Sequence, residues 1–209
     1  MRTYYNRIAG QSLERLAALG DGVFAIAMTL LVLDLHVPAS AAIHGERELW
    51  RALVALAPRL ETYCLSFLTL GIFWVGHQTQ LSHFARSDRH LAWIHIGFLS
   101  AVSLIPFSTA LLSEFITYRL AVAVYWLNLL LLGIAAYSAR RYAARAGLVK
   151  ADVTAEMTAA TERRIIIAQA LYAARALLCL INTYVSIAVI VLIQLNYALA
   201  PRIRPLDRI

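Results

Sequence analysis

Charged and titratable residues stand inside or beside long apolar segments of this chain. Arg15 and Asp21 lie at the entrance of the first such segment, and Asp34 closes it. His77 and Arg175 fall within later ones. A charged side chain within a bilayer is costly, and it commonly pairs with a partner or marks a path for ions or protons. These residues therefore point to ion or proton movement, to polar contacts between helices, or to both.

The sequence carries little sign of other chemistry. It has no Gly-x-Ser-x-Gly elbow, no glycine-rich phosphate loop and no paired cysteine spacing typical of zinc. Cys64 and Cys179 fall in separate apolar segments, where a thiol behaves as a small apolar side chain, so we expect no disulfide. An intramembrane metal or haem site would need two or more facing histidines, and only His77 and His95 lie in such segments. We expect no enzyme activity, no catalytic residue, no metal and no cofactor.

The composition is that of an integral membrane protein. Of the 209 residues, 61% are hydrophobic and 15% are charged, and the mean hydropathy is +0.67. A bilayer-spanning helix needs about 20 apolar residues. The sequence therefore predicts a single all-α membrane domain over residues 1–209, with six spans at about 14–36, 56–82, 91–113, 119–144, 162–180 and 183–200.

The distribution of basic residues favours this count and gives an orientation. With six spans and both termini in the cytoplasm, fourteen of the 19 Lys and Arg lie inside and four lie outside, while Arg175 is within the fifth span. A five-span alternative places three C-terminal arginines outside, so the weak turn near Asn182 separates the last two spans. Basic inner loops beside anionic lipid explain the net charge of +7, and no nucleic-acid partner is needed.

Helical geometry divides the first span into two faces. At about 100° per residue, one stripe lies within about 40° of the direction of Ile26, and Asp21 points about 140° away from it. The stripe consists of Arg15, Leu19, Gly22, Ile26, Leu30 and Leu33. Arg15 and Asp21 are six residues apart and cannot pair along their own helix. Arg15 could simply be a cytoplasmic anchor and Asp21 a complement to the helix dipole, and the stripe could face lipid or the protein core.

These residues resemble a known family signature. Arg-x-x-x-Phe-Ser-Asp followed by Gly-Val-Phe-Ala-Ile-x-x-Thr-Leu-Leu-Val-Leu is typical of the transmembrane protein 175 family of potassium channels. Here Leu19 and Gly20 replace the Phe and Ser, and the remainder matches through Leu33. The resemblance continues in Leu65-Ser66-Phe67, Phe73-Trp74-Val75-Gly76-His77 and Pro106-Phe107-Ser108-Thr109.

The resemblance implies a prokaryotic homotetramer in the plasma membrane, with four first helices around a potassium-permeable pore and no re-entrant filter loop. By position, Ile26, Leu30 and Leu33 become the apolar constriction, with Thr29 and Gly22 as pore-lining support. Ile26 is expected to form the tightest ring and to gate by dewetting.

The remaining polar residues receive structural roles from the same resemblance. Asp21 is expected to meet Trp74 and His77 of the second span, unless those two form an ordinary interfacial pair. Arg15 then needs an acidic partner on another helix or subunit. Asp34, about 80° from Ile26, either concentrates cations at the outer mouth or faces a neighbouring helix.

A second function class stays open at this point. A proton-coupled transporter or carrier would use the intramembrane titratable groups, chiefly Asp21 and His77. Such a protein would show a saturable, pH-driven flux that depends on Asp21 and is indifferent to Ile26.

Overall fold

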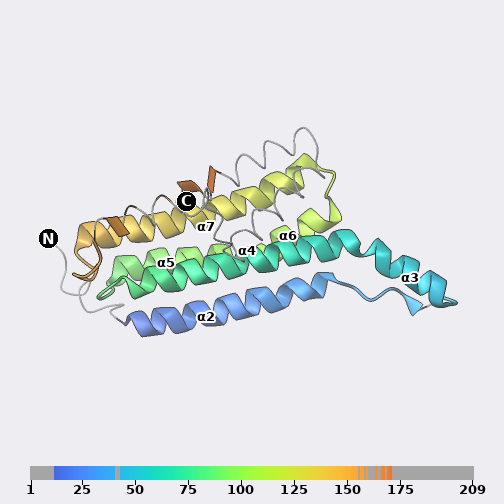
Figure 1. Cartoon of the computed structure of the whole chain (residues 1–209), viewed down its shortest axis with the longest axis horizontal. Coiled ribbons are helices and arrows are strands. Elements are labelled where there is room, and N and C mark those ends of the chain that lie inside the picture. The colour runs from blue at the N-terminus through green and yellow to red at the C-terminus, as the bar shows by residue number, and fades with distance from the viewer. Residues whose placement is uncertain are drawn as a thin grey trace, which may run out of the picture.

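The described part of the chain is helical. The computed structural model describes residues 12–40 and 43–154, together with positions 156–157, 159, 163, 166–167 and 169–170. Its long helices run side by side along one common direction (Figure 1). The predicted sixth span, 183–200, and most of the fifth, 162–180, lie outside the described residues.

The first apolar segment forms α2 (Leu13–Leu30) and continues as a single 3₁₀ turn, η1 (Leu31–Asp34). Ser12 caps the helix, because its hydroxyl accepts a hydrogen bond from the backbone N–H of Arg15 at 3.2 Å. Glu14 in the first turn complements the positive end of the helix dipole. The sequence predicts this span at 14–36.

A short helix that the sequence analysis does not predict precedes the second span. This helix, α3 (Glu46–Ala55), contains no buried residue and projects beyond the ends of its neighbours (Figure 1). It meets α4 (Ala57–Ser82) at a bend of 44°. Pro58 lies in the first turn of α4, where its missing N–H costs no helical hydrogen bond.

The third predicted span, 91–113, is broken in the structure. It consists of α5 (Arg89–Ser103) and α6 (Ile105–Glu114), with Leu104 between them. Pro106 explains the break, because proline cannot donate a helical hydrogen bond and its ring disfavours a helical conformation at the preceding residue. Asp88 caps α5 by accepting from the N–H of Leu91 at 2.9 Å.

The fourth predicted span, 119–144, corresponds to α7 (Arg119–Ala146). Gly147 ends this helix with a positive φ of 66°, a conformation that glycine adopts without steric cost. Beyond it, Phe84 and Val149 form an isolated antiparallel bridge between the loop after α4 and the loop after α7.

Three of the described helical segments are long and apolar enough to cross a membrane. They are Leu13–Asp34, Arg89–Glu114 and Arg119–Ala146, and the bent pair α3 and α4 is a fourth candidate. The six-span count therefore stays a prediction. One end of the bundle brings together the start of α2, the end of α4, the start of α5 and the end of α7 (Figure 1). We call it the basic end. It carries Arg15, Arg86, Arg89, Arg141 and Arg145.

Candidate functional site

The two faces of α2 have opposite environments. Leu16, Gly20, Phe24 and Ala27 are buried against the other helices. The predicted stripe lies on the other side, where the side chains of Ile26 and Leu33 are 61% and 67% exposed, and those of Leu19 and Leu30 are exposed as well. A single subunit therefore presents a continuous apolar surface along one side of its first long helix.

Gly22 of the stripe and Thr29 beside the stripe add surface without an apolar side chain. Thr29 is exposed, and its hydroxyl donates a hydrogen bond to the carbonyl oxygen of Ile26 at 2.8 Å. The hydroxyl proton is thereby used within the helix, and the oxygen lone pairs are left to face outward. Gly22 is exposed, and a Cβ added to it would meet nothing within 4 Å. Thr29 thus leaves a hydroxyl oxygen at the surface of α2, and Gly22 leaves open space there.

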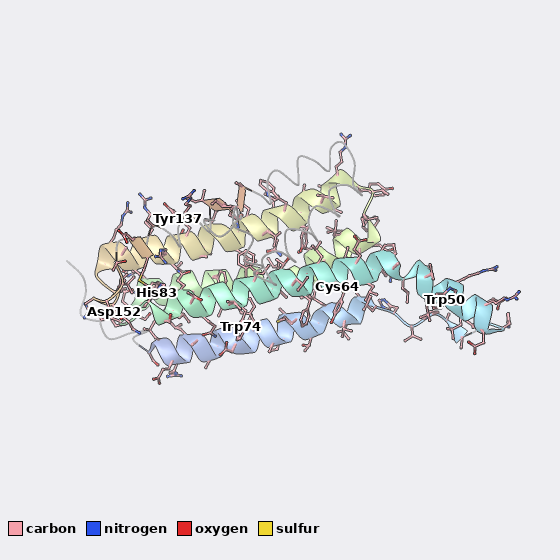
Figure 2. All side chains as sticks on the ribbon, viewed as in Figure 1. Trp50, Cys64, Trp74, His83, Tyr137 and Asp152 are labelled. Atoms are coloured by element: carbon pink, nitrogen blue, oxygen red, sulfur yellow. The ribbon has the colours of Figure 1, made fainter. Side chains whose placement is uncertain are left out.

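Asp21 is held by two side chains of α4. Trp74 Nε1 donates to Asp21 Oδ1 at 2.8 Å, and Gln78 Nε2 donates to the same oxygen. Trp74 lies on α4, the helix that runs next to α2 (Figure 2). The carboxylate thus fastens the first helix to the second through two neutral donors. Trp74 belongs to the predicted network, and Gln78 is an addition to it.

His77 has a different partner from the one that the sequence analysis expects. The expectation that it meets Asp21 is wrong for hydrogen bonding, because the described structure pairs it with His95 of α5. The two Nε2 atoms lie 2.7 Å apart in the buried interior, so one ring donates and the other accepts. The ring of Phe98 stacks on that of His77 at a centroid distance of 5.2 Å, and Phe24 lies 5.9 Å away.

Gly20 explains how His77 comes to lie so close to α2. A Cβ built on Gly20 would stand 2.8 Å from Cε1 of His77, which is closer than real side chains pack. The family signature has Ser at this position, so this chain lacks both the hydroxyl and the Cβ. The imidazole ring of His77 occupies the space that a side chain at position 20 would take. His77 therefore contacts α2 on one side and His95 of α5 on the other.

Arg15 remains without a partner in the described part of the chain. Its side chain is exposed, and the only hydrogen bond there that involves Arg15 outside regular helix pairing is the one from its backbone N–H to Ser12. Glu14 beside it is exposed as well, and it too has no side-chain hydrogen bond or ion pair among the described residues.

At the other end of α2, Asp34 is half-buried and contacts α6. Ser113 Oγ donates to Asp34 Oδ2 at 2.5 Å. Nearby, Arg59 of α4 donates to Glu114 of α6 at 2.6 Å. Of the two readings of Asp34, the described contacts match the one in which it faces a neighbouring helix.

Among the described residues, no group of three or more His, Cys, Asp or Glu side chains could hold a metal ion. The side chains that reasoning from sequence missed are Gln78, His95 as the partner of His77, and Ser113. Gln78 lies four residues after Trp74, so helical spacing alone indicates that the two share a face. No comparable signal links His95 or Ser113 to their partners, which lie on other helices.

Known proteins match both the sequence and this arrangement. The family described as endosomal/lysosomal potassium channel TMEM175 matches residues 15–106. The chain is 41% identical over 125 residues to a potassium channel of Streptomyces collinus, covering 58% of this chain and 59% of that one. It is 34% identical over 110 residues to the human endosomal/lysosomal proton channel TMEM175, covering 50% of this chain and 22% of that protein.

A solved structure extends the match over most of the chain. It is the crystal structure of a lysosomal potassium-selective channel TMEM175 homolog from Chamaesiphon minutus. The TM-score is 0.77 at 29% sequence identity, with 90% of this chain and 97% of that chain covered. In sequence over residues 15–106, and in fold over most of its length, the chain is similar to members of the TMEM175 family.

The matched family is one of membrane ion channels and is not a class of enzymes. The sequence matches are partial, since this chain spans less than 60% of the length of the bacterial curated relative from Streptomyces collinus. The matched region contains α2 from Arg15 onward and all of α4 and α5. These helices carry the stripe, the Asp21 contacts and the histidine pair.

Proposed function

We propose that this chain is the subunit of a potassium-permeable cation channel in a prokaryotic plasma membrane, with four copies of α2 around a central pore and both termini in the cytoplasm. The observation that carries the proposal is the exposed stripe of α2, which is opposite to a fully packed face. The bacterial relative from Streptomyces collinus and the Chamaesiphon minutus homolog, both named for potassium, support the choice of ion.

In this proposal, Ile26, Leu30 and Leu33 narrow the pore. Each lies on the exposed stripe, and rings of apolar side chains block ions by excluding water until the ring widens. Ile26 forms the tightest ring. Sodium holds its hydration water more firmly than potassium, so a narrow apolar ring passes potassium more readily and gives modest selectivity.

Thr29 and Gly22 support permeation beside these rings. The lone pairs of Thr29 Oγ1 are free of the helix backbone, because the hydroxyl uses its proton on Ile26 O. Gly22 leaves a wider segment on the cytoplasmic side of the constriction. On the sides of α2 that face away from the pore, the helix is held by Asp21, Trp74 and His77. Arg15 lies at the cytoplasmic entrance of the pore.

Replacing Ile26 by Asn tests the constriction. The polar side chain should wet the ring, raise potassium flux into liposomes and lower the preference for potassium over sodium. Leu131→Asn is a matched control, because Leu131 is also exposed, at 52%, but lies on α7. The control should leave flux per inserted channel unchanged. Equal flux in wild type and Ile26→Asn would remove Ile26 from the pore.

A proton-coupled transporter or carrier is the second candidate, and two observations favour it. Vertebrate relatives are named proton channels, and this chain buries a pair of histidines behind α2. The same liposomes decide between the two functions. A saturable flux driven by a pH gradient, lost in Asp21→Asn and unaffected by Ile26→Asn, would favour the transporter.

A further inference from the structure

We propose that α5 of each subunit packs against α2 of the next subunit, on the exposed flank formed by Ala18, Ala25 and Val32. We call these three residues the bare flank of α2. The inference rests on the proposed function, because it needs four copies of α2 around one axis. It names a second copy of this chain as the partner of a surface that the proposed pore does not use.

The exposed arc of α2 is wider than a pore needs. At about 100° per residue, the bare flank lies about 80° to 120° from the direction of Ile26, on the side of Asp21. In a ring of four helices, the neighbouring copies lie about 45° to either side of the pore direction. The bare flank therefore lies behind that contact and cannot face the pore, although the subunit leaves it exposed.

The opposite flank of α2 is filled by the subunit's own helices. Leu16 and Ala27 lie about 80° and 100° from Ile26 in the other sense, and both are buried. Ala27 belongs to the same core cluster as Phe98 of α5. Since α4 lies on the side where it holds Asp21, α5 covers this second flank. The subunit is thus asymmetric about the pore direction, with α5 beside one flank of α2 and a bare surface on the other.

Fourfold rotation brings α5 of one copy onto the bare flank of the next. From its own α2, α5 lies about 100° from the pore direction, and the next α2 on that side lies about 45° from it. With packed helices about 8–10 Å apart, α5 then also lies about 9 Å from that next α2. Seen from there, α5 lies about 110° from the pore direction, in the sense of the bare flank. The asymmetry of one subunit therefore closes the ring head to tail.

Contacts within the subunit give the heights of the two surfaces. The rings of Phe24 on α2 and Phe98 on α5 lie 6.0 Å apart, and both helices start at the basic end and run in the same direction (Figure 1). Ser100 therefore lies near the height of Ala25, within about one helical turn. Rotation about an axis along the pore keeps these heights, so the two residues meet across the contact.

The exposed face of α5 has the shape for such a contact. Trp93, Ile96 and Ser100 share an arc of about 60° and are all exposed in the subunit. Ser100 and Ala25 have small side chains at the same height, which lets two helix backbones approach closely. Trp93 and Ile96 then add apolar area on the cytoplasmic side of this close approach.

Side chains of α4 form a wall beside the bare flank. Asp21 lies about 20° beyond Val32 around α2, and Trp74 Nε1 donates to its carboxylate. Trp74 therefore lies next to the bare flank, with 41% of its side chain exposed. Phe67 lies seven residues earlier on α4, on the same face, and is exposed as well. Together the wall and the bare flank form a groove that is continuous with the proposed pore contact, and α5 of the next copy is the helix that reaches it.

Disulfide crosslinking between subunits tests this arrangement. Ala25→Cys and Ser100→Cys are made on separate, differently tagged full-length chains in which Cys64 and Cys179 are replaced by alanine, and the two chains are coexpressed. Mild oxidation in membranes, followed by a denaturing gel, measures the dimers. The mixed dimer should exceed the dimers of either variant with itself by roughly tenfold, because a disulfide needs Cα atoms within about 7 Å and this contact joins unlike surfaces. Leu131→Cys, exposed on α7, is the matched control partner and should give only background with Ala25→Cys.

Added bulk at the same two positions tests the close approach. Ala25→Trp and Ser100→Trp each place a large side chain where the single subunit has an exposed surface. Each should lower the tetramer fraction by roughly tenfold in native mass spectrometry, because overpacking a contact is destabilising. Leu131→Trp is the control and should assemble like wild type. Far-UV circular dichroism verifies that the variants keep their helical content, and the crosslinks do not depend on these bulky variants.

The outcomes separate this contact from the channel. If wild type assembles and conducts potassium into liposomes, but the mixed dimer stays at the level of the Leu131→Cys control, the α5 contact is wrong and the channel proposal stands. The same conclusion follows if Ala25→Cys crosslinks mainly with itself, or if both tryptophan variants assemble like wild type. If wild-type protein is monomeric and passes no potassium, the channel proposal fails, and the contact fails with it.

Discussion

The two faces of α2 are made of similar side chains, yet they have different surroundings. Phe24 is 1% exposed on one face and Ile26 is 61% exposed on the other. The buried face is fixed by specific neighbours, namely His77, Phe98 and the other members of the core cluster. The exposed face has no such neighbours within the described chain. Apolar character alone therefore does not say whether a residue packs or faces a pore.

The charged residues of the same helix repeat this contrast. Asp21 is satisfied within its own subunit by Trp74 and Gln78. Arg15 has no partner in the described part of the subunit. The carboxylate of Asp21 is thus satisfied by side chains of its own subunit, whereas the guanidinium of Arg15 is not satisfied by the described residues. This difference indicates which changes should harm folding and which should harm conduction.

The largest effect is expected from truncation on the buried face. Phe24→Ala should lower the free energy of unfolding by on the order of 3 kcal/mol, because it leaves a cavity among His77, Phe98 and the core. Ile26→Ala should change the stability of the monomer by less than about 0.5 kcal/mol, as exposed positions usually do. Denaturant unfolding of both variants in detergent measures the two values. Equal losses would mean that the faces are not distinct in the protein.

A smaller effect is expected from adding one methyl group to either face. Gly20→Ala should cost about 1–3 kcal/mol, because the new Cβ displaces the ring of His77 and breaks its contact with His95. Gly22→Ala is the matched control two residues away, where the Cβ meets open space. It should be neutral or stabilising by up to about 1 kcal/mol, since alanine is the better helix former.

Thermal unfolding of the purified protein compares the two glycine variants. His95→Ala in the Gly20→Ala background adds a second test, because it removes the partner that pins the imidazole. The double variant should lose less than the sum of the single losses, as expected for residues in contact. Additive losses would show that Gly20 and the histidine pair act independently.

The exposed stripe was accessible to prediction from the sequence, because it depends only on the helical period. Ile26, Leu30 and Leu33 share one direction by spacing alone, and a helix with a packed face must leave the opposite face outward. The break of the third span also had a local signal in Pro106. In the same way, Gly45 followed by Glu46 and Glu48 resembles a helix start and marks α3, although the helix is too short to be seen as a span.

The contacts behind the stripe were not accessible in this way. His77 and His95 are 18 residues apart on different helices, and their 2.7 Å approach depends on how α4 and α5 are packed. Asp34 and Ser113 are 79 residues apart. Helical period says which residues share a face, and it does not say which faces of two helices meet. The polar partners of buried groups therefore need the tertiary structure.

The smallest effect on potassium flux is expected from a change at Asp34, the last residue of η1. Its carboxylate accepts from Ser113 of α6, and it is half-buried rather than open. Asp34→Asn keeps an oxygen that can accept from Ser113 and removes the charge. Since the side chain is directed toward α6, potassium flux at low salt should fall by less than about twofold. Flux into liposomes across a series of salt concentrations measures this. A larger fall that vanishes at high salt would place the Asp34 charge at the pore mouth, because screening removes only fields that act through water.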